Sequence, residues 1–497
     1  MEAKSIVSSK VRWIFIIVVV ILLTIPSFLA EGGEEGELLG NLLPVWSIIP
    51  FVGMLLSIAI VPLVKGEWWE HNLFNVAIIW SLVFLVPFAI GFGPHEAGKV
   101  FYESVALDYL PFIVLLLGLF AVSGGIVLKG SLAGTTKVNL LLLAVGIIIA
   151  SWVGTTGASM LMIRPILKAN AWREKKAHVV VFFIFLVSNI GGCLTPLGDP
   201  PLFLGFLRGV PFFWTMRLAP LLLFNAVILL IAFIILDKKL LKKEYAAGRK
   251  PVVDEPKEKL RVEGLHNFIF LLIIVGAVIL SGSLASTFTG TDGEALGIPL
   301  PYDLVLPGNN VIQMVLILLA AFLSIKTTKK DLHESNGFTW GPIQEVGSLF
   351  IGIFITMIPA LAILNAKGAS LGLTEPWQFF WASGALSSFL DNAPTYLVFG
   401  TTGASLGASA GVAFGTVGTI SIGLLAAVSA GAVFMGANTY IGNAPNFMVR
   451  SIAEENGVKM PSFFGYMWWS LRFLIPTFIL DTLLFFCSFS PFAFLVS

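Results

Sequence analysis

Charged residues are scarce in this chain, which indicates that water is not the solvent for most of its surface. Only 12% of the 497 residues are Asp, Glu, Lys or Arg, while 57% are hydrophobic. An average soluble protein has about twice that charged fraction. Apolar stretches of roughly 20 residues, the length that crosses a bilayer, recur along almost the whole sequence. The chain is therefore predicted to be one all-α polytopic membrane domain, a multi-pass protein of the cell (inner) membrane.

Cysteine and histidine are also rare, which excludes several classes of protein. Cys193 and Cys487 lie far apart, and the five histidines are scattered, so no disulfide framework, zinc site or haem site is expected. No nucleophile–base pair or phosphate loop stands out, so we expect no enzyme and no cofactor. The net charge of +1 gives no reason to expect nucleic acid as a partner.

Charge placement predicts the domain organisation. Residues 1–30, a basic start and an apolar run, are a signal peptide or a first transmembrane helix, and both place Glu31 outside. The Lys- and Arg-rich segment 238–266 is expected to be a cytoplasmic linker, and the acidic segment 289–307 to lie outside. The linker separates a first repeat with N-terminal scaffold helices, 31–237, from a second repeat and last helix, 267–497. The predicted spans are 44–64, 72–93, 105–127, 138–163, 178–210, 217–236, 267–288, 308–325, 342–365, 376–401, 411–452 and 463–488.

The segment 138–163 is predicted to be a re-entrant hairpin. A simple crossing would carry five basic residues between positions 164 and 176 to the outside, against the positive-inside rule. The conflict disappears if the chain turns at Gly154-Thr155-Thr156-Gly157 and returns to the cytoplasmic side. Such irregular backbone at membrane depth is tolerated where protein or a watery cavity satisfies it.

Runs of Gly and Pro break two of the long spans. Segment 178–210 is interrupted by the motif 191–201, whose prolines and glycines cannot form continuous helix. Segment 411–452 is interrupted at 436–446 in the same way, and 376–401 is a second hairpin with its turn at Asp391-Asn392-Ala393. Aligning the breaks pairs 154–156 with 391–393 and 197–201 with 441–445. The hairpins open to opposite sides, so the sequence predicts inverted repeats, two re-entrant hairpins and two broken transmembrane helices, typical of a secondary transporter.

The four breaks gather the candidate ion site. Small polar side chains suit a hard cation, and an intramembrane Asp is a functional-site hypothesis by default. Burial favours the protonated form of a carboxyl group and a bound cation favours its ionised form, so one carboxylate can hold a proton or an ion in turn. Asp199 and Asp391 could also be ordinary turn or N-cap residues. The predicted ion- or substrate-binding residues are Thr155, Thr156, Thr195, Asp199, Asp391, Asn392, Thr395, Asn438, Thr439 and Asn443.

Two further charged residues have alternative interpretations. Arg164 closes the first hairpin and is expected to snorkel to the cytoplasmic interface, the alternative being a pairing with Asp199 or an anionic substrate. Glu345 is a proton-relay candidate in an apolar segment.

The break motifs resemble those of the ion transporter superfamily. The stretches 194–201, 389–395 and 438–446 look like the signature breaks of this group, which includes NhaD-type sodium/proton antiporters, ArsB-type permeases and citrate transporters. Pro196-Leu197-Gly198-Asp199 and Leu390-Asp391-Asn392-Ala393-Pro394 are most similar to the NhaD-type pattern. The segment 154–160 and Pro200-Pro201 depart from it. The resemblance implies sodium or lithium exchange for protons, a scaffold and a moving transport domain, and a homodimer.

Three functional hypotheses follow. The first is sodium (lithium)/proton antiport through Asp199 and Asp391. The second is sodium- or proton-coupled symport of citrate or another carboxylate, held by the Thr and Asn groups and the positive helix ends. The two Asp residues repel an anion, which favours antiport unless sodium ions occupy both. A membrane-embedded enzyme or channel is the third, and the broken inverted helices favour alternating access over a pore.

Overall fold

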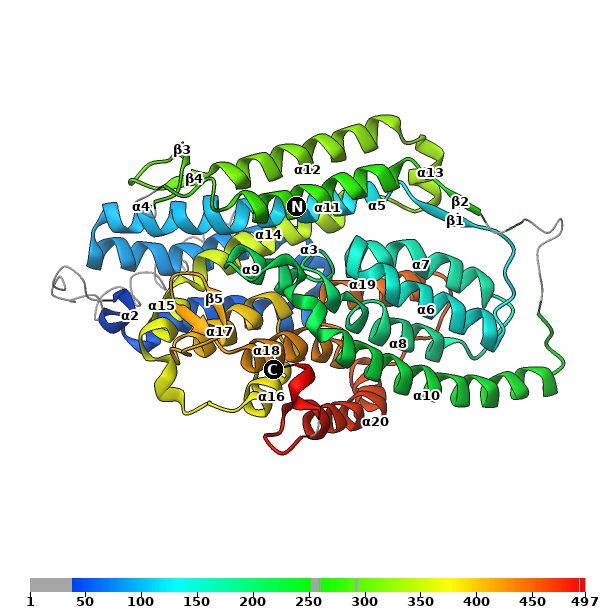
Figure 1. Cartoon of the computed structure of the whole chain (residues 1–497). Helices are drawn as coiled ribbons and strands as arrows, with labels where there is room; N and C mark the ends of the chain where they lie inside the picture. Colours follow the sequence, from blue (N-terminus) through cyan, green and yellow to red (C-terminus); the bar gives the residue numbers. More distant parts are fainter. Residues whose placement is uncertain (1–37, 252–258, 260, 291–293, 491, 497) are drawn as a thin grey trace, which may run out of the picture. The chain divides into compact units, whose positions relative to one another are not determined.

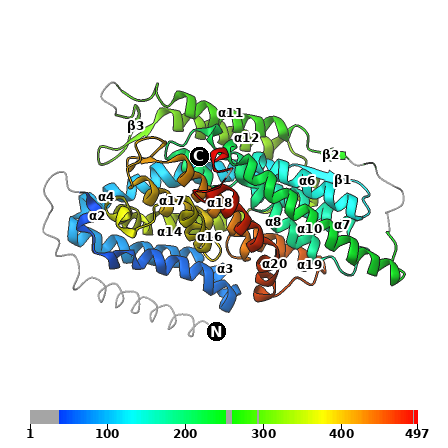
Figure 2. The same cartoon turned by 60° about the horizontal axis from the view of Figure 1, so that its bottom comes forward.

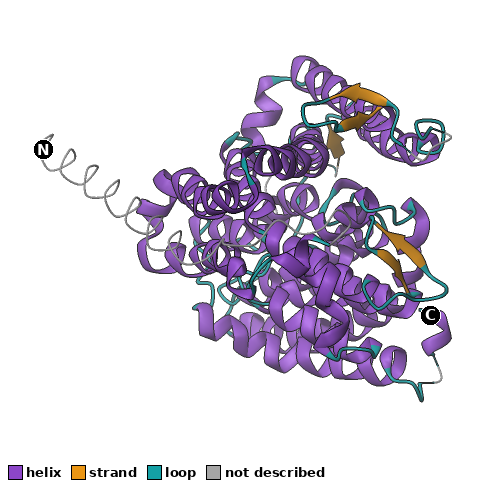
Figure 3. Cartoon of the chain, turned by 90° about the vertical axis from the view of Figure 1, so that its left-hand side faces the viewer, coloured by secondary structure: helices purple, strands orange, loops and turns teal. Residues whose placement is uncertain are grey.

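Helices dominate the computed structural model, which describes residues 38–251, 259, 261–290, 294–490 and 492–496. The predicted signal peptide or first helix, 1–30, lies outside the described residues. Within them, nine helices are long and apolar enough to cross a membrane, or ten if one bent pair is a single span. The strands of the described residues form only short antiparallel pairs (Figure 3). The prediction of an all-α polytopic membrane protein is confirmed.

The chain divides into two compact units that do not coincide with its two halves. Unit 1 comprises the chain up to Ile113 together with Phe288–Gly308 and Trp340–Leu371, and unit 2 comprises Val114–Thr287, Asn309–Thr339 and Gly372–Ser497. All four predicted breaks belong to unit 2. The division of the chain at the linker stays a prediction.

Unit 1 is built around one long helix and a second helix, from a distant part of the chain, that packs against it. Its elements are α2 (Leu39–Leu42), a 3-10 turn (Val45–Ile48), α3 (Ile49–Phe92), α4 (Pro94–Tyr102), a π-helical turn (Glu103–Tyr109), the start of α5 (Leu110–Ser123), β3 (Gly297–Pro299), β4 (Val305–Pro307), α14 (Gly341–Thr356), α15 (Ile358–Lys367) and a 3-10 turn (Gly368–Leu371). Non-helical backbone at Lys65 interrupts α3. Together with the preceding 3-10 turn, α3 provides two membrane-length spans, Val45–Pro62 and Val64–Phe92. The two spans predicted there are therefore present, joined without a loop.

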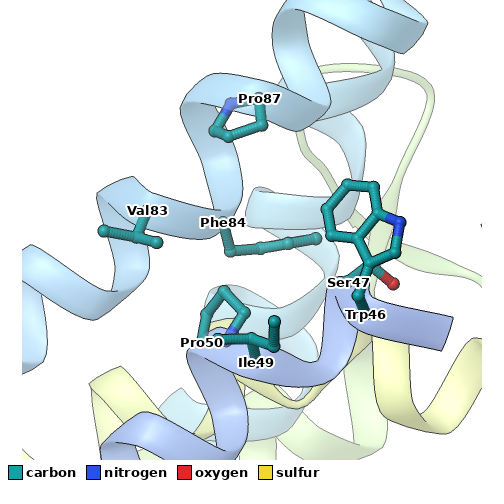
Figure 4. Close-up of a pocket in the computed structure, with 7 residues that line it drawn as sticks. All are labelled: Trp46, Ser47, Ile49, Pro50, Val83, Phe84 and Pro87. Carbon is teal, nitrogen blue, oxygen red and sulfur yellow. The ribbon is translucent and has the colours of Figure 1, made fainter. Parts of the chain in front are cut away.

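The interior of unit 1 is apolar and holds its helices with few polar contacts. Phe84, Phe88 and Ile355 belong to one buried cluster. Tyr109 donates a hydrogen bond to the carbonyl of Gly347 over 3.0 Å. A cleft of about 20 Å³ lies beside Trp46 and Phe84 (Figure 4). It has room for about one water molecule and is too small for a substrate site.

The first part of unit 2 contains the first predicted hairpin and broken helix, seen together in Figure 1. Its elements are the rest of α5, β1 (Val127–Lys129), α6 (Thr136–Val153), α7 (Thr155–Ala169), α8 (Ala177–Leu186), a 3-10 turn (Ile190–Leu194), α9 (Pro200–Leu207), a 3-10 turn (Phe212–Leu218), α10 (Ala219–Ala246), β2 (Arg261–Glu263), α11 (Asn267–Leu284), α12 (Gly308–Thr327) from Asn309 onward, and α13 (Lys330–Ser335). Gly154 joins α6 to α7 with φ +82°, a backbone conformation that glycine adopts readily. The helix–turn–helix expected over 138–163 is thus present.

The second part of unit 2 repeats this plan (Figure 2). Its elements are α16 (Pro376–Ser387), α17 (Asn392–Ala404), β5 (Val412–Phe414), β6 (Gly418–Ile420), α18 (Ile422–Met435), a 3-10 turn (Gly436–Asn438), α19 (Ala444–Glu455), α20 (Phe463–Asp481), a π-helical turn (Thr482–Phe486) and a 3-10 turn (Ala493–Leu495). The predicted span 411–452 begins too early, because β5 and β6 form a hairpin and the helix starts at Ile422. Gly411, Gly415 and Gly418 have positive φ, which suits a tight hairpin and not a helix.

The described ends of the predicted basic linker form regular secondary structure. Helix α10 continues to Ala246, through a run of Leu, Lys, Glu and Ala that favours helix. At the other end of the linker, β2 pairs antiparallel with β1, where Lys129 and Glu263 form a salt bridge of 2.7 Å.

Inside unit 2, helices of each repeat pack against helices of the other repeat. Helix α9, which follows the first break, packs against α17 of the second hairpin, and α19, which follows the second break, packs against α7 of the first hairpin. Each hairpin thus contacts the broken helix of the other repeat, which brings the four breaks together.

Candidate functional site

The two broken helices unwind in the same way. The Thr195 hydroxyl donates to the carbonyl of Ser151, and the Thr439 hydroxyl donates to the carbonyl of Ser388. Each hydroxyl also accepts a backbone N–H two residues later, over 3.2 Å in both breaks. The repeat inferred from motif alignment therefore extends to individual hydrogen bonds.

Glycines make this unwinding possible, because at these positions the backbone comes into close contact with another backbone segment of the same break. A Cβ on Gly198 would lie 2.0 Å from the carbonyl oxygen of Gly192. In the second break, a Cβ on Gly442 would lie 2.5 Å from the carbonyl oxygen of Gly436. No side chain fits at either position without moving the facing backbone.

Asp199 lies where all four breaks meet. It is 1% exposed, and its Oδ1 accepts hydrogen bonds from the Thr155 hydroxyl over 2.7 Å and from the Asn443 amide over 3.2 Å. Its Oδ2 accepts from the side-chain amide of Asn392. Thr155 and Asn392 are the first residues of α7 and α17, and Asn443 precedes α19. One carboxylate is thus held by both hairpins and by the opposite broken helix.

The donors around Asp199 are all neutral. No Lys, Arg or His forms an ion pair with it in the described part of the chain, and Asp391 is close enough to repel it electrostatically. Burying an unpaired carboxylate is costly, so its charge needs a proton or a cation.

Asp199 is not an ordinary N-cap, although it directly precedes α9. An N-cap side chain accepts from the backbone N–H of the second or third helical residue. The second residue of α9, Pro201, carries no N–H, and the N–H of the third, Leu202, donates to the backbone carbonyl of Asp199 over 3.1 Å. The Asp199 side chain makes no cap hydrogen bond. Its carboxylate remains available to the centre of the site.

Asp391 is bound differently. Its side chain caps α17 by accepting from the backbone N–H of Ala393 over 3.0 Å, and Thr395 donates to its backbone carbonyl over 3.0 Å. The side chain is partly exposed. The N-cap interpretation therefore describes Asp391, whereas it fails for Asp199.

Two buried amide oxygens near the breaks accept no hydrogen bond from the described residues. They are Oδ1 of Asn392, whose amide group donates to Asp199, and Oδ1 of Asn438, whose amide group donates to the Ser388 hydroxyl over 2.9 Å. Buried carbonyl oxygens normally have a partner. Oxygens of this kind are the ligands that hard cations take.

Sequence reasoning missed the residues that support the centre. Asn189 donates to Oδ1 of Asn446 over 2.7 Å, and Asn443 donates to Oδ1 of Asn189 over 3.2 Å. Ser151 and Ser388, whose carbonyls anchor the two threonines, stand at matched distances before the two hairpin turns. That matched position was a signal that could have identified them.

The remaining predicted residues lie in different surroundings. Thr156 is half-buried and makes no hydrogen bond within the described residues, so it does not join Thr155 at Asp199. Glu345 is exposed near the start of α14 in unit 1, where Glu70 acts on it electrostatically. Arg164 lines a cavity between β1 and α7 and forms no ion pair with Asp199. A relay role for Glu345 stays a prediction.

These features define a class of protein. The fold is that of a multi-pass membrane transporter whose broken helices enclose a polar centre. A family described as "Putative citrate transport" matches residues 40–486, and the chain belongs to this family. No curated protein matches the chain.

Proposed function

We propose that this protein is a secondary active transporter of the cell (inner) membrane that exchanges sodium or lithium ions for protons at Asp199. The observation that carries the proposal is a buried carboxylate held by three neutral donors from both repeats, with no basic partner among the described residues. A group in that position must be neutralised from outside the protein, by a proton or by a cation.

The surroundings of Asp199 favour a small hard cation. The Asn392 oxygen lacks a partner among the described residues, and the Thr155 hydroxyl can turn its lone pairs toward an ion in place of donating its proton. Asp391 adds a second carboxylate within electrostatic reach. Sodium and lithium take oxygen ligands of this kind, and broken helices are where transporters hold them.

The asymmetry between the repeats favours one exchange site. Asp199 and Asn443 precede their helices with nearly the same backbone angles, −148° and 141° against −154° and 138°. One repeat thus supplies the carboxylate and the other supplies a neutral amide at the matching position. The amide of Asn443 donates a hydrogen bond to the carboxylate and adds no second negative charge for the ion to bind.

A second candidate function is sodium- or proton-coupled symport of citrate or another carboxylate. The family description favours it. The starts of α7, α9, α17 and α19 meet in unit 2, and the positive ends of helices attract anions. Sodium at Asp199 would then act as the coupling ion.

Transport in proteoliposomes separates the two functions. Vesicles with an imposed inside-acid gradient receive sodium, lithium, potassium or citrate, and the internal pH is followed by fluorescence. Antiport predicts that sodium or lithium alone dissipates the gradient and that Asp199→Asn and Asp391→Asn abolish the response. Asp303→Asn is the matched control, because Asp303 is exposed in a loop with φ +59°, a conformation that Asn tolerates.

Two other outcomes would contradict the antiport proposal. If the cations leave the gradient intact while sodium drives uptake of labelled citrate, antiport is wrong and symport replaces it. If neither occurs in protein that is folded and reconstituted, the proposed role of Asp199 fails with both.

A further inference from the structure

A polar cavity lies in unit 2, and none of the residues that hold Asp199 lines it. It has a volume of about 500 Å³ and is bordered by β1, the C-terminal half of α7, the start of α8 and the loops after α13 and α19. This volume is large enough for a small organic ion or a lipid headgroup. Its main polar lining residues are Lys129, Arg164, Lys168, Lys176, Asn336 and Asn456.

The cavity is strongly basic. Four of its lining residues are Lys or Arg, and none is Asp or Glu. Lys129 is compensated by Glu263 at 2.7 Å, and Glu455 acts on Arg164 electrostatically. Arg164 and Lys176 form no ion pair within the described residues. Arg164 and Lys176 therefore bring positive charge to the lining without a described carboxylate in direct contact with either group.

Arg164 has a buried donor group, Nη1, that lacks an acceptor among the described residues. A buried donor without an acceptor is costly, and a charged one more so. The guanidinium lies against Gly337, where φ is +59° and a Cβ would be 2.2 Å from Nη2. The backbone is thus shaped to leave room for this side chain.

Lys176 adds a second charge at a favourable place. It occupies the N-cap position of α8, next to the positive end of that helix. Burial lowers the pKa of its ammonium group. An anion in the cavity would stabilise both the ammonium group and the helix end.

We propose that this cavity binds a multivalent oxyanion through Arg164 and Lys176, as a site additional to the ion site at Asp199. Arg offers a planar set of donors that suits phosphate and carboxylate oxygens, and Lys adds a point charge. The oxyanion is either a soluble phosphate compound or the headgroup of an anionic phospholipid, since both present the same chemistry.

The first test is calorimetric titration of inorganic pyrophosphate into the full-length protein. The protein is held in nanodiscs of neutral phosphatidylcholine at low ionic strength, where charge interactions are least screened. We expect saturable binding that Arg164→Gln and Lys176→Gln each weaken by about tenfold or more, the effect of losing one charged hydrogen bond. Lys330→Gln is the matched control and should bind normally, because Lys330 is 89% exposed and lies outside the cavity.

A second arm identifies the source of the oxyanion. In nanodiscs that contain phosphatidylglycerol, loss of pyrophosphate binding would assign the cavity to a lipid headgroup, and unchanged binding would assign it to a soluble anion. Lys176→Gln tests the site alone if Arg164→Gln does not fold. The proposal is overturned if the wild-type protein shows no saturable binding in neutral nanodiscs, or if the folded cavity variants bind like Lys330→Gln.

Discussion

Thr155 and Asn392 donate hydrogen bonds to opposite oxygens of the Asp199 carboxylate, although they begin helices in different halves of the chain. Both stand one residue after the turn of their hairpin, so they are related by the internal repeat. A movement that separates the two hairpins must break one of these bonds. The hydrogen bonds of one carboxylate are therefore coupled to the relative position of both repeats, and we expect its protonation or ion occupancy to be coupled in the same way.

The hydroxyl of Thr155 can be tested against that of its neighbour. Thr155→Val removes the hydroxyl while keeping the shape of the side chain, and hydrogen bonds to charged groups contribute about 1.5–3 kcal/mol. We expect the apparent KM for sodium to rise about tenfold or more in exchange assays. Thr156→Val removes a hydroxyl that makes no hydrogen bond within the described residues. It should change the apparent KM by less than about twofold. Equal effects of the two substitutions would contradict the assigned geometry.

The close backbone contact at Gly198 predicts a loss of stability. Gly198→Ala places a Cβ 2.0 Å from the carbonyl oxygen of Gly192, so the break must open. Overpacking of this kind costs about 1–3 kcal/mol, and we expect a lower melting temperature in detergent together with loss of exchange. Gly423→Ala is the control, since its Cβ would meet only Pro376 at 3.6 Å and alanine favours helix. An unchanged melting temperature for Gly198→Ala would show that the break is not packed as described.

A buried charge cluster at the base of the first hairpin is expected to be structural. Asp237 accepts from Arg173 over 2.7 Å, from His178 over 2.7 Å and from Thr136 over 2.5 Å, and neither member of the Arg173–Asp237 pair is exposed. Arg173→Met leaves the carboxylate without its main partner, which should lower the free energy of unfolding by about 3–5 kcal/mol. Lys330→Met, which removes an exposed pair with Glu334, should change it by less than about 1 kcal/mol. Chemical denaturation in detergent measures both, and similar values would show that the cluster is not anchoring α10.

The breaks could be predicted from sequence because their cause is local. Prolines and glycines at 196–201 cannot form continuous helix, and the same composition at 436–446 aligns Asp199 with Asn443. Composition and alignment alone therefore predict Thr155, Asn392 and Asn443 as members of the site. The spans of α6, α7, α16 and α17 follow from the same turns.

What could not be predicted depends on contacts between distant segments. Whether Asp199 caps its own helix or faces the site is decided by Thr155 and Asn392, which reach it from other helices. The missing N–H of Pro201 also weakens the alternative of capping. Asp237 ends an apolar run and looks like an interfacial residue in sequence, but Arg173 folds back onto it. The hairpin of β5 and β6 was missed because it directly precedes the apolar helix α18, so that its own Gly, Val and Thr residues, which disfavour helix, were included in the predicted span.

Competition between protons and sodium at Asp199 predicts the pH dependence of exchange. A proton occupies the carboxylate that the cation needs, so lowering the pH should raise the apparent KM for sodium without changing the maximal rate. The increase should approach about tenfold per pH unit once most of the sites are protonated, because one proton displaces one ion. Initial rates of sodium-dependent pH change in proteoliposomes, measured over a series of pH values and sodium concentrations, give both parameters. If lowering the pH reduces the maximal rate and leaves the KM for sodium constant, the proton acts at another group. Glu345→Gln would then be the next variant to measure.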